Sequence, residues 1–142
     1  MANQNPILII EDDMDDHEIF REAFASLDVK HELIFYTEAS KALDFLLVTE
    51  RQLFLIMSDM NLPGMNGLAF RTVIQQNQYL KEKSIPFVFF TTGTSKAQVK
   101  EAYELTVQGF FIKPASFNEL RERLKLIVGY WSHCIHPNSV TF

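Results

Sequence analysis

The sequence predicts an α/β protein built on a doubly wound, five-stranded parallel sheet. Three observations lead to this fold class: five short apolar runs recur along the 142 residues, segments with helical spacing follow them, and most of the runs are apolar throughout. Unbroken apolar runs are typical of strands that are buried on both faces of a parallel sheet. Because parallel crossover connections are right-handed, five successive strand–helix units place helices on both faces of one sheet.

The predicted strands are bounded by residues that favour strand starts and turns. Pro6 and Pro86 each precede an apolar run, at a position where a missing backbone N–H does little harm. The loop after the third run contains Pro63-Gly64 and Asn66-Gly67, and both dipeptides favour tight bends. The predicted strands cover residues 7–10, 33–36, 53–57, 87–90 and 110–112.

Helical periodicity predicts one helix after each strand. The first helix carries an apolar stripe over residues 19–27, with Asp15 or Asp16 as its N-cap. Ser116 and Glu119 have the spacing of a capping box at the start of the last helix. The predicted helices begin near residues 15, 37, 67, 95 and 116, and the last ends near residue 131.

Length and composition indicate one domain, residues 1–131, followed by a tail, residues 132–142, that continues loosely along the surface. Hydrophobic residues make up 47% of the chain, with 13 Phe, which is enough for a sizeable core. The net charge of −5 argues against a non-specific nucleic-acid binder or a protein of anionic membranes. A single cysteine, Cys134, excludes an intramolecular disulfide, and the polar start of the chain does not resemble a signal peptide. We therefore expect a cytoplasmic protein.

Acidic, hydroxyl and amine side chains follow four of the predicted strands. The acidic run 11–13 follows the first strand, Asp59 the third, Thr91 the fourth and Lys113 the fifth. Ligands of open parallel sheets bind outside the carboxyl ends of the strands. We therefore expect these side chains to line one pocket.

Carboxylates gathered in one pocket repel each other unless positive charge offsets them. At a separation of about 4 Å and an effective dielectric constant of about 20, each like-charge pair costs about 4 kcal/mol. Lys113 supplies one positive charge, and Mg²⁺, which prefers oxygen ligands, would supply two more. The Asn61 carbonyl follows Asp59 closely enough to be a further ligand. An aspartate beside such a cation is suited to accept a phosphoryl group.

Four motifs at these strand ends resemble those of response-regulator receiver domains, the phosphoacceptor half of two-component signalling. The motifs are Ile-Glu-Asp-Asp, Asp-Met-Asn-Leu-Pro-Gly-Met-Asn-Gly, Thr-Thr-Gly and Lys-Pro, in that order along residues 6–131. The resemblance implies a flavodoxin-like (βα)5 fold with strand order 2-1-3-4-5. It is closest to stand-alone receivers, including those paired with bacterial phytochromes, because the last predicted helix ends in Tyr130-Trp131.

The resemblance also implies a role for each acid. Asp59 would be the phosphorylation site. Asp12 would bind Mg²⁺ directly, Glu11 would act mainly through water, and the Asn61 carbonyl would complete the protein's share of the metal ligands. Asp13 adds an acid to which the resemblance assigns no role.

Three further residues would act on the phosphoryl group or respond to it. Thr91, rather than Thr92, would hydrogen-bond a phosphoryl oxygen, and Lys113 would pair with the phosphoryl oxygens. Phe110 occupies the position of the switch aromatic, which is often Tyr in the family. The resemblance implies a cis peptide bond between Lys113 and Pro114.

The expected function is that of a single-domain response regulator rather than a metabolic enzyme. A sensor histidine kinase or phosphotransfer protein would donate the phosphoryl group, and a downstream protein target would bind the surface formed by the fourth helix, fifth strand and fifth helix. Tyr130 and Trp131 either cap the core or help to form a homodimer. His133, Cys134 and His136 are interpreted as incidental rather than as a metal site.

Three other functions compete with that of a response regulator. An aspartate-dependent phosphatase or other hydrolase of small phosphoesters also uses a nucleophilic Asp, but it usually carries a second acid two residues later, where this chain has Asn61. A flavin- or nucleotide-binding module would need a phosphate loop where the chain has an acidic run. A receiver that only binds partners is disfavoured because the site residues are intact.

Overall fold

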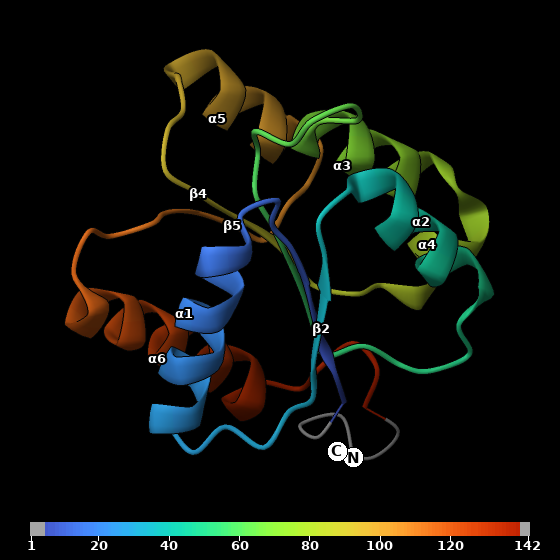
Figure 1. Cartoon of the computed structure of the whole chain (residues 1–142). Coiled ribbons are helices and arrows are strands. Elements are labelled where there is room, and N and C mark those ends of the chain that lie inside the picture. Colours follow the sequence, from blue (N-terminus) through green and yellow to red (C-terminus); the bar gives the residue numbers. More distant parts are fainter. Residues whose placement is uncertain (1–4, 140–142) are drawn as a thin grey trace.

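The computed structural model describes residues 5–139, which form a five-stranded parallel sheet with helices on both faces (Figure 1). The strand order β2-β1-β3-β4-β5 confirms the predicted topology. Residues 1–4 and 140–142, parts of the predicted polar N-terminus and of the predicted tail, lie outside the described residues. The strands are β1 (Ile7–Ile10), β2 (Leu33–Tyr36), β3 (Leu55–Ser58), β4 (Phe87–Thr91) and β5 (Gly109–Ile112).

In the described part of the chain, six helices connect and follow the strands, one more than predicted. The additional helix arises because Asn77 adopts an extended backbone, with φ −89° and ψ 116°, which ends α3 and allows the Asn77 side chain to cap α4. None of the helices within residues 5–139 is long and apolar enough to cross a membrane. The helices are α1 (Met14–Ser26), α2 (Ala39–Val48), α3 (Gly67–Gln76), α4 (Gln78–Lys83), α5 (Lys96–Glu104) and α6 (Phe117–His133).

The cap of α1 is Asp13, which corrects the prediction of Asp15 or Asp16. Asp13 has an extended backbone, and its side chain accepts a hydrogen bond of 2.9 Å from the N–H of Asp15. Asp15 and Asp16 instead fall in the first turn of the helix, where negative charge interacts favourably with the helix dipole. A cap at Asp13 gives this acid a structural role and places Asp16 at the third position of the helix.

Two hydrophobic clusters fill the spaces on the two faces of the sheet. Side chains alternate along β4, so that Phe87 and Phe89 pack with α2–α5 while Val88 and Phe90 pack with α1 and α6. Figure 1 shows the same division, with α1 and α6 together on one side. Because both faces are buried, the sheet is a rigid base that holds its carboxyl edge in place.

The tail packs against the sheet rather than lying loosely, which corrects the prediction for residues 132–139. His136 is buried, and its Nε2–H donates to the carbonyl of Phe54 at 2.7 Å. Its Nδ1 accepts from the N–H of Asn138 at 3.1 Å. The Phe54 ring stacks on His31 at a centroid distance of 4.0 Å and on His136 at 5.2 Å. An imidazole that both donates and accepts in this way is neutral.

We expect this stack of rings to make stability depend on pH. Burial lowers the pKa of both His31 and His136 below the usual 6.5. A lowered folded-state pKa gives stabilisation that is present above pH 6.5 and is lost as the pH falls. Urea unfolding at pH 7.5 and pH 5.5 should therefore show a smaller pH-dependent loss in a His31→Gln, His136→Gln double variant than in the wild type.

The exposed His133 provides the matched control for this measurement. Its imidazole bonds only to the Gly129 carbonyl of its own helix among the described residues. His133→Gln should therefore keep the pH dependence of the wild type. An unchanged pH dependence in the double variant would contradict the proposed contribution of the stack.

Candidate functional site

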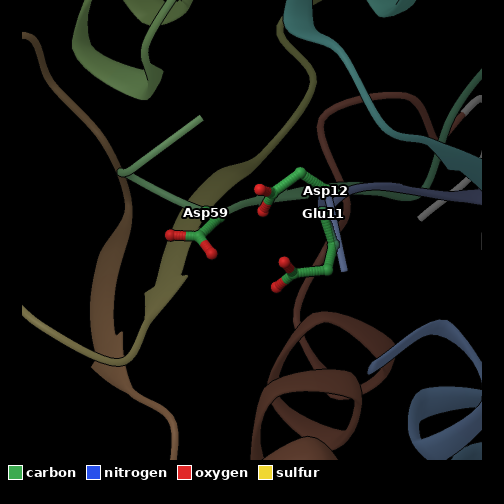
Figure 2. Close-up of side chains that lie close together, drawn as sticks. All are labelled: Glu11, Asp12 and Asp59. Carbon is green, nitrogen blue, oxygen red and sulfur yellow. The ribbon is translucent and has the colours of Figure 1, made fainter. Parts of the chain in front are cut away.

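The carboxyl ends of the strands bring the predicted acids together. Glu11 and Asp12 follow β1 and Asp59 follows β3, and one carboxylate oxygen of each lies within 4.8 Å of the others. Figure 2 shows the three side chains gathered around one space. The register explains this meeting: Ile10 pairs with Ser58, so the next residues of the two strands emerge side by side. This is the only such acidic group within residues 5–139.

Lys113, which follows β5, reaches into this acidic group. Its Nζ contacts a carboxylate oxygen of Glu11 and lies 3.2 Å from Oδ2 of Asp16 and 3.4 Å from Oδ2 of Asp59. Only 11% of the Lys113 side chain is exposed, so water screens these charges weakly. One buried ammonium group therefore serves several carboxylates.

The ionisation of Glu11 reflects its burial in this group. Burial raises its pKa to about 7, although the hydrogen bond and the charge of Lys113 oppose that rise, and the charge of Asp59 adds to it. Burial alone would lower the pKa of Lys113, but its hydrogen bond to Glu11 and the charges of Glu11, Asp59 and Asp16 raise it overall. The ammonium is thus held in its charged form, and added positive charge would favour the ionised form of Glu11.

Asp59 is held by donors on both of its oxygens. Thr91, which is fully buried, donates its hydroxyl to Oδ1 at 2.7 Å, and the N–H of Asn61 donates to the same oxygen at 3.0 Å. Oδ2 faces Lys113. The structure therefore places Thr91 in the site, whereas the neighbouring Thr92 is exposed and lines an adjoining cavity of about 410 Å³, which Asp16 and Lys113 also line.

The loop after Asp59 is fixed by close backbone contacts. A Cβ at Gly67 would lie 2.6 Å from the Asp59 carbonyl oxygen, so only glycine fits there. The Asn61 side chain donates to the Gly93 carbonyl at 3.1 Å and so links this loop to the one after β4. Asn61 is exposed, and the hydrogen bond from its backbone N–H keeps it next to the Asp59 carboxylate.

Phe110 lies on β5 and is partly buried. Its ring packs on Phe89 at a centroid distance of 5.6 Å and at 46°, at the margin of the larger core cluster. The peptide bond between Lys113 and Pro114 is trans, like every other in the described part of the chain, which corrects the expected cis bond. The trans form is also the intrinsically favoured one for X–Pro bonds, by about 0.5–1 kcal/mol.

Sequence reasoning missed three residues that contact the site. Asp16 approaches Lys113, His17 donates to the Glu11 carbonyl, and the Ser58 hydroxyl donates to the Asp59 carbonyl at 2.9 Å. A signal exists for Asp16: with Asp13 as the N-cap it falls at the third helical position, whose side chain turns back toward the preceding strand. His17 and Ser58 act through main-chain atoms, which leave no pattern in the sequence.

Comparison with known proteins defines the class to which this fold and site belong. Residues 7–125 match the family model described as the response regulator receiver domain, so the chain belongs to that family. These are signalling domains of two-component systems, and the acidic group is consistent with aspartate phosphorylation and Mg²⁺ binding.

Individual relatives narrow the likeness to stand-alone receivers. The response regulator Rcp1 of Synechocystis is 30% identical over 130 residues, which cover 88% of this chain and 87% of the relative. A probable methanogenesis regulatory protein, FilR2 of Methanothrix harundinacea, is 30% identical over 129 residues, covering 88% and 82%.

Solved structures give the same result. The phosphorylated cyanobacterial phytochrome response regulator RcpA superposes with a TM-score of 0.83 at 25% identity, covering 96% of this chain and 99% of that one. The Mn²⁺-bound form of Rcp1 superposes with a TM-score of 0.79 at 28% identity, covering 92% and 96%.

The charge balance of the site can be tested by replacing Lys113, whose ammonium group offsets the carboxylates. In the absence of divalent ions at pH 8, we expect Lys113→Gln to lower the free energy of unfolding by about 3 kcal/mol, because it leaves buried carboxylates uncompensated. Adding Asp59→Asn should recover part of this loss, as urea unfolding of the single and double variants would show.

The loss should be smaller at pH 5.5. Because the folded-state pKa of Glu11 is raised, its contribution to stability is complete below pH 4.5 and is lost as the pH rises through about 7. A protonated Glu11 is neutral and has no charge for Lys113 to offset, so Lys113→Gln should cost less free energy of unfolding at pH 5.5. Equal losses at pH 8 and pH 5.5 would show that Lys113 does not act as a counter-charge.

Proposed function

We propose that this protein is a single-domain response regulator that accepts a phosphoryl group on Asp59 from a sensor histidine kinase or a phosphotransfer protein. The observation that carries this proposal is the environment of Asp59, whose two oxygens face Thr91 and Lys113 beside two further acids. In this proposal residues 1–131 are the receiver domain and residues 132–142 its tail.

The donor set suits Mg²⁺. Glu11, Asp12 and Asp59 supply carboxylate oxygens, the Asn61 carbonyl would supply a fourth oxygen, and hard divalent cations prefer such ligands. The raised pKa of Glu11 supports this assignment, since it means that Lys113 does not fully offset the cost of burying this carboxylate. When bound, the ion would neutralise charge on the carboxylates and on the incoming phosphoryl oxygens.

The transfer step needs only positioning and charge neutralisation from the protein. An oxygen of Asp59 forms a bond to phosphorus while the bond between phosphorus and the donor's imidazole nitrogen breaks, and the leaving imidazole takes up a proton from water. Lys113 is placed to pair with the phosphoryl oxygens. The product is an acyl phosphate on Asp59.

The change of charge would then alter the partner surface. The Thr91 hydroxyl, which now bonds Asp59, would turn to a phosphoryl oxygen, and the ring of Phe110 would move into the vacated space. A shift from 1:99 to 99:1 requires about 5.5 kcal/mol of differential stabilisation. Charge-assisted hydrogen bonds of about 1.5–3 kcal/mol each would supply it.

The proposed readout is a protein–protein interaction on the face formed by α5, β5 and α6, in the cytoplasm and without nucleic acid or membrane. Tyr130 on that side is 65% exposed, and its ring packs edge-on against Trp131 at a centroid distance of 5.0 Å. This exposure leaves the Tyr130 ring available to a downstream target or to a second copy of the chain.

We expect Asp59→Asn to abolish phosphorylation. With Mg²⁺ and phosphoramidate as donor, the wild type should gain one hydroxylamine-labile phosphoryl group by intact mass spectrometry, and the variant at least a hundredfold less, because an amide is a poor nucleophile. Asp13→Asn is the matched control, since Asn caps a helix as well as Asp does. Full labelling of Asp59→Asn would exclude Asp59 as the acceptor.

The hydrolase alternative predicts a different result from the same preparation. A phosphatase would turn over small phosphomonoesters many times per molecule, whereas a receiver would retain one phosphoryl group. Multiple turnover that depends on Asp59 would favour the alternative.

Removal of divalent cations should stop the reaction. EDTA should lower the labelling rate at least tenfold, and either Mg²⁺ or Mn²⁺ should restore it, because both bind oxygen ligands. Asp12→Asn should need a higher cation concentration for the same rate. Labelling at the full rate in EDTA would contradict the proposed metal site.

A further inference from the structure

A buried histidine of α1 contacts the main chain that carries the two acids after β1. The His17 side chain is 2% exposed, and its Nε2 lies 2.6 Å from the carbonyl oxygen of Glu11. Its ring stacks on Phe35 of β2, with a centroid distance of 4.6 Å and an interplanar angle of 27°. Because the carbonyl can only accept, Nε2 carries the hydrogen, and the stack fixes the plane of the ring.

The Glu11 carbonyl depends on this hydrogen bond. The pairing of β1 ends at Ile10, whose carbonyl accepts from the N–H of Asp59, and the N–H of Glu11 donates to Tyr36. Beyond that point the Glu11 carbonyl has His17 as its one hydrogen-bond partner among the described residues. The imidazole therefore supplies the hydrogen bond that a neighbouring strand would otherwise donate to this carbonyl.

The orientation of that peptide group sets the position of the Asp12 backbone. The Glu11 carbonyl and the N–H and Cα of Asp12 belong to one rigid plane, so holding the carbonyl also fixes the N–Cα axis from which the Asp12 side chain projects. Within residues 5–139 the Asp12 side chain has no hydrogen bond and no ion pair, although its carboxylate belongs to the acidic group. Unlike Glu11 and Asp59, it is oriented by the backbone alone.

We propose that His17 is a positioning residue, which holds the Glu11–Asp12 peptide so that Asp12 faces the divalent cation. The inference rests on the proposed function, because it concerns the same metal site. A histidine that only fills the core would need the ring and its stacking on Phe35, but not the Nε2–H. The two readings therefore differ in a single hydrogen-bond donor.

Replacements that separate the ring from the donor test the proposal. His17→Phe keeps an aromatic ring beside Phe35 and removes the donor, whereas His17→Gln loses the ring and places an N–H at nearly the same reach. Mn²⁺ affinity, measured by the loss of the free-ion EPR signal at pH 8, should fall about tenfold in His17→Phe, as for other groups that orient metal ligands. His17→Gln should stay within about threefold of the wild type.

His31→Phe is the matched control. His31 is also a buried histidine that stacks on a phenylalanine and bonds a backbone carbonyl, that of Asn5, but it lies at the opposite end of the strands. The same replacement there should alter stability and leave Mn²⁺ affinity unchanged. If His17→Phe does not fold, His17→Met provides the comparison, because Met matches the length of Gln and lacks the donor.

The outcomes separate this inference from the proposed function. If the wild type does not bind Mn²⁺, or if Asp12→Asn does not weaken binding, the metal site itself is wrong. If Asp12→Asn weakens binding and folded His17→Phe or His17→Met binds as the wild type does, the role of His17 is refuted. Equal losses in the Gln variant and in the variants without the donor would also refute it, since an N–H donor at this position would then make no difference to the affinity.

Discussion

The ammonium group of Lys113 balances an edge of the sheet at which several carboxylates would otherwise repel one another. It contacts Glu11, Asp16 and Asp59 at once, yet the pKa of Glu11 is still raised to about 7. The charge of Lys113 alone therefore does not offset the cost of burying Glu11 beside Asp59, and a dication would supply the positive charge that is still needed. The rigid, doubly covered sheet keeps the acids from moving apart to relieve the repulsion.

Much of the fold could be predicted because its signals are local and repeated. Apolar runs placed all five strands, and their alternation with helical periodicity led to the observed class. The predictions were wrong at helix ends, where more than one side chain could act as the cap. Three nearby acids could cap α1, and Asp13 does so because its backbone is extended, whereas Asp15 and Asp16 lie in the first turn of the helix. The break at Asn77 is similar, since a capping side chain there ends one helix and starts the next.

The site was predictable to the extent that it follows from strand ends. Glu11, Asp59, Thr91 and Lys113 each come just after or at the end of a predicted strand, and the parallel register brings them together. What could not be predicted depends on packing between elements distant in sequence. His17 reaches the site through a ring stack and a main-chain carbonyl, and neither contact leaves a periodicity or a motif.

The stack of His31, Phe54 and His136 also determines how the chain enters and leaves the fold. The Asn5 carbonyl is hydrogen-bonded to the His31 ring, and the His136 ring is hydrogen-bonded to the Phe54 carbonyl. Both described ends of the chain are therefore anchored at the amino ends of β1 and β3. The acidic pocket opens at the other end of the same strands. A reporter protein or an immobilisation tag attached close to Asn5 or Ser139 would therefore lie on the side away from the acidic pocket. A short linker joining the two anchored ends is likewise a natural starting point for circular permutation of this fold.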